Sequence, residues 1–168
     1  MKIGGKATRS IWLEPDGKSV GILDQTLLPH RVAMLRLTAC AHAAHAIASM
    51  QTRGAPLIGA VAAYGLALAL RADASEDNLA SAYALLLASR PTAINLKWAL
   101  DEMVAVVRNR PHEQRVTAAY RRVAEICDQD VAINAAIGRH GLTLIERIAA
   151  QKQGAPVNVL THCNAGWL

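Results

Sequence analysis

Arg53 and Gly54 stand directly before an apolar stretch that opens with a proline, in the segment Thr52-Arg53-Gly54-Ala55-Pro56. Proline is tolerated at the first position of a helix, so we expect a helix to begin near Pro56. The start of a helix carries free backbone N–H groups and the positive end of the helix dipole, which together suit a phosphate. Gly54 lets an anion approach the backbone, and Arg53 adds a bidentate donor. Arg53, Gly54 and Ala55 are therefore candidate phosphate ligands, although an ordinary loop with an exposed arginine fits the same residues.

A second arginine is followed by a proline, in Arg90-Pro91-Thr92. Proline restricts the backbone of the residue before it, so the preceding helix should end near Ser89 and the loop should present Arg90 rigidly. An arginine held in this way is a second candidate ligand for an anion. The alternative is an arginine that donates to the last carbonyl groups of its own helix.

Cys163 is the third candidate, within Thr161-His162-Cys163-Asn164-Ala165-Gly166. It follows a short β-branched run, residues 157–162, which predicts a buried strand that opens into a loop. In open parallel sheets, ligands bind beyond the carboxyl ends of the strands, where Cys163 would lie. Adjacent strand residues face opposite sides, so His162 and Cys163 are not expected to form a catalytic pair. The alternative is a buried cysteine that packs as a small apolar residue.

The composition bounds the class of protein. The chain has 168 residues, of which 52% are hydrophobic, 18% charged and 4% aromatic. These values exclude a disordered chain and favour closely packed helices over a β-sandwich. The length suits one domain, or one domain and the start of a second. Cys40, Cys127 and Cys163 are too few and too scattered for a disulfide framework, and residues 1–5 do not begin a secretory signal, so we expect a cytoplasmic protein.

Charge and hydropathy limit the partners. The formal net charge is +5. The densest basic stretch, residues 108–122, contains Glu113 and a single aromatic and is followed by further acidic residues, which is typical of a solvated helix face rather than of a nucleic-acid surface. The apolar run over residues 55–70 is shorter than the roughly 20 residues of a membrane span, so we expect a buried helix and no membrane. Cys40-x-His42-x-x-His45 is the one His/Cys cluster, but the cysteine lies off the face of the two histidines, so no metal site is expected.

Turn, cap and breaker residues predict the elements that must position these candidates. Strands are expected over residues 8–14 and 19–24, around the turn Pro15-Asp16-Gly17-Lys18, and over residues 32–37. Thr38 is a candidate helix cap, either Ser75 or Asp77 is expected to start the helix that ends near Ser89, and Gly138 and Gly141 are expected to end a long helix. The helices are expected over residues 39–51, 56–71, 75–89, 94–107, 113–138 and 142–150.

The predicted fold class is α+β. A small three-stranded antiparallel sheet plus a helical bundle forms an N-terminal domain over residues 1–150. It leads into the first strand of a truncated Rossmann-like α/β domain, whose start occupies residues 151–168, because a lone buried parallel strand needs partners to be stable.

Four segments together resemble one family in its own order along the chain. They are Asp24-Gln25-Thr26-Leu27-Leu28-Pro29, the stretch from Thr52 to Gly65, the stretch from Ser89 to Leu100, and Leu160-Thr161-His162-Cys163-Asn164-Ala165-Gly166. These segments look like those of the methylthioribose-1-phosphate isomerases. The same superfamily includes the ribose-1,5-bisphosphate isomerases and the regulatory subunits of the eukaryotic initiation factor 2B complex, and the last two segments favour the isomerases.

The resemblance implies an aldose–ketose isomerase of methionine salvage that uses no metal and no organic cofactor. It implies that Arg53, Gly54, Ala55 and Arg90 bind a phosphorylated sugar, 5-methylthioribose 1-phosphate, and that Cys163 is catalytic. It also implies a homodimer with an active site between two domains. Members of the family are about twice as long, and their second half supplies an acid/base aspartate, so we expect the 168-residue chain alone to be nearly inactive. A non-enzymatic regulatory module of the same superfamily remains the alternative.

Overall fold

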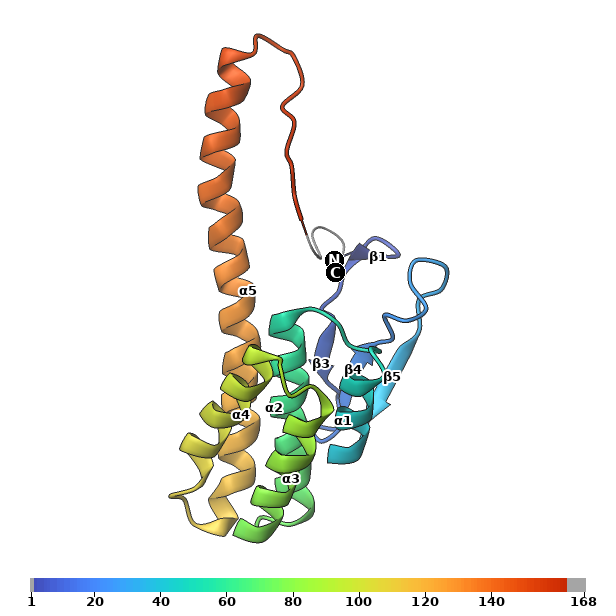
Figure 1. Ribbon diagram of the computed structural model, residues 1–168, viewed down its shortest axis with the longest axis vertical. Coiled ribbons are helices and arrows are strands. Elements are labelled where there is room, and N and C mark those ends of the chain that lie inside the picture. Colours follow the sequence, from blue (N-terminus) through green and yellow to red (C-terminus); the bar gives the residue numbers. More distant parts are fainter. Residues whose placement is uncertain (1, 163–168) are drawn as a thin grey trace. The chain divides into compact units, whose positions relative to one another are not determined.

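The computed structural model describes residues 2–162 and divides the chain into two compact units, Met1–Ile126 and Cys127–Leu168. The first unit contains all of the strands among the described residues, four complete helices and the beginning of a fifth. The second contains the rest of that fifth helix and the segment that follows it. The three-stranded sheet and the helical bundle predicted from the sequence are therefore both present in the first unit (Figure 1).

The sheet is a three-stranded antiparallel meander of β3 (Ile11–Leu13), β4 (Val20–Leu23) and β5 (Met34–Leu37). The turn between β3 and β4 forms because Asp16 accepts hydrogen bonds from the backbone N–H groups of Lys18 and Ser19, both at 2.9 Å. All four residues of β4 are buried, which makes it the central strand in packing as well as in order. A second, two-stranded hairpin of β1 (Lys2–Ile3) and β2 (Lys6–Ala7) was not expected.

The bundle is built around α2 (Ala55–Ala72), with α1 (Cys40–Ala48), α3 (Glu76–Ser89) and α4 (Ile94–Val107) packed against it. Every residue from Ile58 to Leu70 is buried. By its length and composition α2 could also cross a membrane, but 72% of this helix is buried inside the protein. It is the core helix that the apolar run predicted.

The two predicted caps have different outcomes. The Ser75 hydroxyl accepts a hydrogen bond from the N–H of Asn78 at 3.2 Å, so the cap of α3 is confirmed. Thr38 does not cap α1, whose N-cap position is Ala39 with no side-chain cap bond. The Thr38 hydroxyl lies instead 3.2 Å from Nδ1 of His42.

The fifth helix, α5 (His112–Gln151), is longer than predicted, because Gly138 and Gly141 do not end it. A glycine within a helix costs about 1 kcal/mol relative to alanine, and it ends the helix only when its backbone turns left-handed. Neither glycine has a positive φ. The helices expected over residues 113–138 and 142–150 are therefore one helix. Its second half carries exposed apolar side chains, among them Ile133, Ile137, Leu144 and Ile148.

The prediction of a strand over residues 157–162 is wrong, because these residues have no regular secondary structure. Val159 and Leu160 are 69% and 100% exposed. A parallel strand is held by hydrogen bonds to neighbouring strands, and no described residue pairs with this segment. The expected beginning of a Rossmann-like domain is thus not observed as a strand.

Candidate phosphate-binding site

The N-terminus of α2 has the geometry that the Arg53-Gly54-Ala55-Pro56 segment predicted. Gly54 is the N-cap residue, with φ 97° and ψ 127°, a left-handed backbone that residues with a Cβ rarely adopt. Its carbonyl oxygen accepts the first helical bond, from the N–H of Ile58 at 3.0 Å. The N–H groups of Ala55 and Leu57 precede that bond, so they have no intrahelical acceptor and point out of the helix end.

The loop before α2 is tied to its surroundings by backbone hydrogen bonds. The N–H of Thr52 donates to the carbonyl of Ala46 in α1 at 3.0 Å. The N–H of Gln25 donates to the carbonyl of Gln51 at 2.9 Å. These bonds place the Asp24-Gln25-Thr26 segment beside the Arg53–Gly54 loop, although 25 residues or more separate them in the sequence.

Asp24 shapes its own segment. Its carboxylate accepts hydrogen bonds from the backbone N–H of Thr26 at 3.0 Å and from the Thr26 hydroxyl at 2.6 Å. An aspartate that accepts from the N–H two residues later forms an Asx turn. Asp24 is therefore a structural residue of this loop, and it holds Gln25 against the loop that precedes α2.

Arg90 lies at the same end of the bundle as Arg53. The helices of the first unit alternate in direction, so α2 and α4 both begin at one end of the bundle (Figure 1). Their first turns are in close contact, because a Cβ at Gly59 would lie 2.8 Å from the carbonyl oxygen of Asn95. Arg90 is the C-cap residue of α3 and precedes α4 by a tight turn, in which its carbonyl accepts from the N–H of Ala93 at 3.0 Å. The fold thus brings the two loops that carry the candidate arginines to one end.

Both candidate guanidinium groups lack a partner within the part of the chain that the structure describes. Arg53 is exposed and Arg90 is half-buried, and neither side chain forms a hydrogen bond or an ion pair with residues 2–162. The alternative interpretation of Arg90, a side chain that donates to the carbonyls at the end of its own helix, is therefore not what the structure contains. Two unpaired arginines beside free N–H groups make this end of the bundle suitable for a dianion.

The arginines of the basic stretch 108–122 are used differently. Arg115 and Arg122 have side chains only 7% and 15% exposed, and they pair with Glu76 at 3.1 Å and Glu102 at 2.8 Å. Arg108 also pairs with Glu76, at 3.1 Å. These arginines hold helices together, so Arg115 and Arg122 do not belong to the solvated helix face that the sequence predicted.

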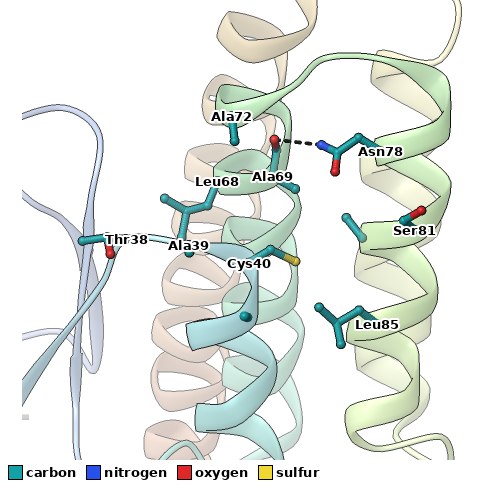
Figure 2. A pocket seen from close by; sticks show the side chains of 11 residues that line it. Thr38, Ala39, Cys40, Leu68, Ala69, Ala72, Asn78, Ser81 and Leu85 are labelled. Carbon is teal, nitrogen blue, oxygen red and sulfur yellow. Dashed lines mark hydrogen bonds between the residues drawn. The ribbon is translucent and has the colours of Figure 1, made fainter.

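A separate cavity of about 340 Å³ lies between α1, α2 and α3. Its walls are mainly apolar, and Figure 2 shows Cys40, Leu68 and Leu85 directed into it from the three helices. Burial raises the pKa of the Cys40 thiol to about 11, so the thiol stays protonated and weakly nucleophilic at neutral pH. Arg53, Gly54, Ala55 and Arg90 do not line this cavity, and within the described residues no group of three His, Cys, Asp or Glu could hold a metal ion.

Cys163 lies outside the described residues, so its predicted role stays a prediction. Gln25 and Thr52, two buried polar residues beside the loop before α2, were not predicted as separate features. Both are at most 5% exposed, which only the folded chain reveals. The one signal in the sequence was their position in two of the segments that carried the resemblance.

Comparisons with known proteins connect this site to a family. Residues 51–168, which include the whole α2 site apart from Gln25, match the model of the Initiation factor 2 subunit family. The chain belongs to that family. Over its 168 residues it is 55% identical to the methylthioribose-1-phosphate isomerase of Paramagnetospirillum magneticum. It covers 46% of that relative and so spans about half the length of the curated isomerases it matches.

Solved structures agree with this membership of the Initiation factor 2 subunit family. The crystal structure of 5-methylthioribose 1-phosphate isomerase from Pyrococcus horikoshii OT3 matches 83% of this chain, and the match spans 41% of that protein, with a TM-score of 0.76 and 32% identity. The translation initiation factor eIF-2B subunit delta from A. fulgidus matches 74% of this chain and 38% of its own, with a TM-score of 0.68 and 29% identity. The resemblance inferred from four sequence segments is confirmed at the level of the family, and two of the three branches named there are among its structural relatives.

Proposed function

We propose that this chain is the N-terminal, phosphate-binding part of an isomerase that converts 5-methylthioribose 1-phosphate to 5-methylthioribulose 1-phosphate in methionine salvage. One observation carries the proposal: the loops that hold Arg53 and Arg90 lie at one end of the bundle, where α2 and α4 begin, and both side chains are unpaired among the described residues. The names of the relatives that match over the whole chain supply the substrate.

The proposed role of this part is to hold the phosphate through the reaction. The substrate is a cyclic sugar that carries phosphate on its anomeric oxygen, and the ring must open without losing that phosphate. The guanidinium groups of Arg53 and Arg90 donate charge-assisted hydrogen bonds to the dianion, and the N–H groups at Ala55 and Leu57 add to them. Fixing the phosphate also fixes C1 and C2 of the sugar, between which a proton or a hydride then moves.

The remaining chemistry is assigned by resemblance. Cys163 is proposed as a catalytic residue that moves a proton or stabilises charge at C1 and C2. An acid/base aspartate is proposed to come from a second half like that of the relatives, and residues 151–168 are proposed as the start of that Rossmann-like half. A homodimer in the cytoplasm, working without a cofactor, completes the proposal.

A regulatory or assembly module is the second candidate function, favoured by the match to the eIF-2B delta subunit. Such a module needs the fold of the bundle but no sugar-phosphate site. A ribose-1,5-bisphosphate isomerase-like enzyme would use the same phosphate ligands on a different sugar. Ligand binding therefore separates the candidates.

Titration calorimetry of the folded 168-residue chain tests the proposal. We expect binding of 5-methylthioribose 1-phosphate, much weaker binding of 5-methylthioribose without the phosphate, and little or no turnover. Binding of neither compound would overturn the proposal and favour the regulatory module. Tighter binding of ribose 1,5-bisphosphate would assign the other isomerase, and measurable turnover by the chain alone would show that the acid/base group does not have to come from a second half.

Replacement of Cys163 by serine tests the catalytic assignment. The assay uses a completed protein, in which this chain is joined to the second half of the Paramagnetospirillum magneticum relative. If Cys163 is catalytic, kcat falls by about a hundredfold or more, because serine has a much higher pKa and lacks the thiol, while KM changes little. If Cys163 only packs, the serine hydroxyl lowers stability by about 1–3 kcal/mol and leaves kcat per folded molecule intact. Full kcat in the Cys163→Ser protein would remove this residue from the site.

A further inference from the structure

Three buried polar atoms next to the Arg53–Gly54 loop have no hydrogen-bond partner among the described residues. They are Nε2 and Oε1 of Gln25 and the hydroxyl oxygen of Thr52. Gln25 is 5% exposed and Thr52 is 0% exposed. Buried polar side chains in native proteins are nearly always hydrogen-bonded, so each exception requires an explanation.

Both residues belong to the backbone that carries the α2 site. The N–H of Gln25 donates to the carbonyl of Gln51 at 2.9 Å, and Thr52 is the next residue. Thr52 in turn directly precedes Arg53, and its N–H is held by the carbonyl of Ala46 at 3.0 Å. The unpaired side-chain atoms therefore lie on the inner side of the loop whose outer side presents Arg53 and the start of α2.

The chemistry of the two side chains is complementary. A carboxamide offers two donors and an acceptor, and a hydroxyl offers one donor and up to two acceptor sites. Neither side chain uses these donors and acceptors within the described residues. The loop thus holds unmet hydrogen bonds beside the place where an anion would bind.

We propose that Gln25 and Thr52 are positioning residues of the phosphate-binding loop, whose hydrogen bonds are completed when a sugar phosphate binds at Arg53 and the N-terminus of α2. Part of the binding free energy then comes from these two residues, although they act through the loop. The inference rests on the proposed function, because it takes a sugar phosphate as the ligand.

Two nearly isosteric variants, Thr52→Val and Gln25→Met, test the proposal in the 168-residue chain with 5-methylthioribose 1-phosphate as the probe. The ligand-free variants should be as stable as the parent chain or more stable in urea, because replacing an unpaired buried polar group by an apolar one is neutral or favourable. Their Kd for the probe should nevertheless rise by about fivefold or more, since each loses a hydrogen bond formed on binding. Thr52→Ser keeps the hydroxyl and should retain the affinity of the parent chain.

The outcomes separate a positioning role from a structural one. Affinity equal to that of the parent chain in both variants would overturn the proposal and leave the proposed function standing. Weaker binding together with a lower urea midpoint would also overturn it, because the loss would then reflect damage to the fold. If the parent chain itself binds no 5-methylthioribose 1-phosphate, the proposed function fails first and this inference with it.

Discussion

The double variant Arg53→Ala/Arg90→Ala should bind 5-methylthioribose 1-phosphate about a hundred to ten thousand times more weakly than the parent chain. A hydrogen bond to a charged group contributes about 1.5–3 kcal/mol, and each 1.4 kcal/mol is a factor of ten in Kd. Both guanidinium groups lack other partners among the described residues, so their removal disturbs no internal ion pair there. Calorimetry of the chain gives Kd, and KM of the completed protein gives an independent value.

A matched control removes the same amount of charge elsewhere. Arg121 and Arg139 are both exposed on α5, and Arg121 lies 3.9 Å from its partner Glu125, a distance at which the pair contributes little. The Arg121→Ala/Arg139→Ala variant should change Kd by less than about twofold, because exposed ion pairs contribute little. Equal losses of affinity in the two double variants would mean that binding depends only on the net charge of the chain. The proposed phosphate site at α2 would then be withdrawn. The two single variants complete a double-mutant cycle. If the effects of the two substitutions on Kd are not additive, both arginines bind the same phosphate.

The start of α2 could be predicted from the sequence because its determinants are local. Pro56 suits the first turn of a helix, and Gly54 suits the left-handed backbone before it, whatever the rest of the chain does. Ser75 was predicted as a cap for the same reason. Thr38 failed as a cap because a competing local contact, the Nδ1 of His42 at 3.2 Å, is available to its hydroxyl.

Other features depend on partners distant in the sequence and were predicted poorly. Residues 157–162 have the β-branched composition of a strand, but a strand also needs a neighbouring strand. Gly138 and Gly141 looked like the end of a helix, but the helix continues through them because good helix formers lie on both sides. The residue composition of a segment therefore favours a helix or a strand there, but contacts with the rest of the chain decide whether it forms.

The placement of the two arginine-bearing loops at one end of the bundle could not be predicted from the spacing of the residues alone. Arg53 and Arg90 were each suggested by a local pattern, and each pattern had an ordinary structural alternative. The alternation of helix directions and the contact of Gly59 with Asn95 bring them to one end of the bundle. The buried Gln25 and Thr52 are a second case, because burial without a partner is visible only in the folded chain.

Arg115→Met should lower the free energy of unfolding by about 3–5 kcal/mol, because each buried carbonyl left unpaired costs about 1–3 kcal/mol, and this is the largest stability effect we expect for one residue outside the site. The Arg115 side chain is 7% exposed and donates to the carbonyls of Ala74, Arg108 and Arg110 at 2.9 to 3.1 Å. It thereby joins the start of α3 and the end of α4 to α5. Methionine is also a long, flexible side chain, but it has no donor and leaves three carbonyls unpaired. Urea unfolding, monitored by the circular dichroism signal of the helices, gives the change in the unfolding midpoint.

Two controls identify the bonds that carry this effect. Arg121→Met makes the same replacement six residues later on an exposed part of α5 and should change stability by less than about 0.5 kcal/mol. Glu76→Gln removes the charge that pairs with Arg115 at 3.1 Å, but Glu76 is 49% exposed, so solvent screening should limit its loss to about 1 kcal/mol. A loss in Glu76→Gln as large as that in Arg115→Met would assign the stabilisation to the ion pair. The expected order, Arg115→Met far above Glu76→Gln and Arg121→Met, assigns it to the three backbone carbonyls, which only a planar guanidinium with several donors can reach at once.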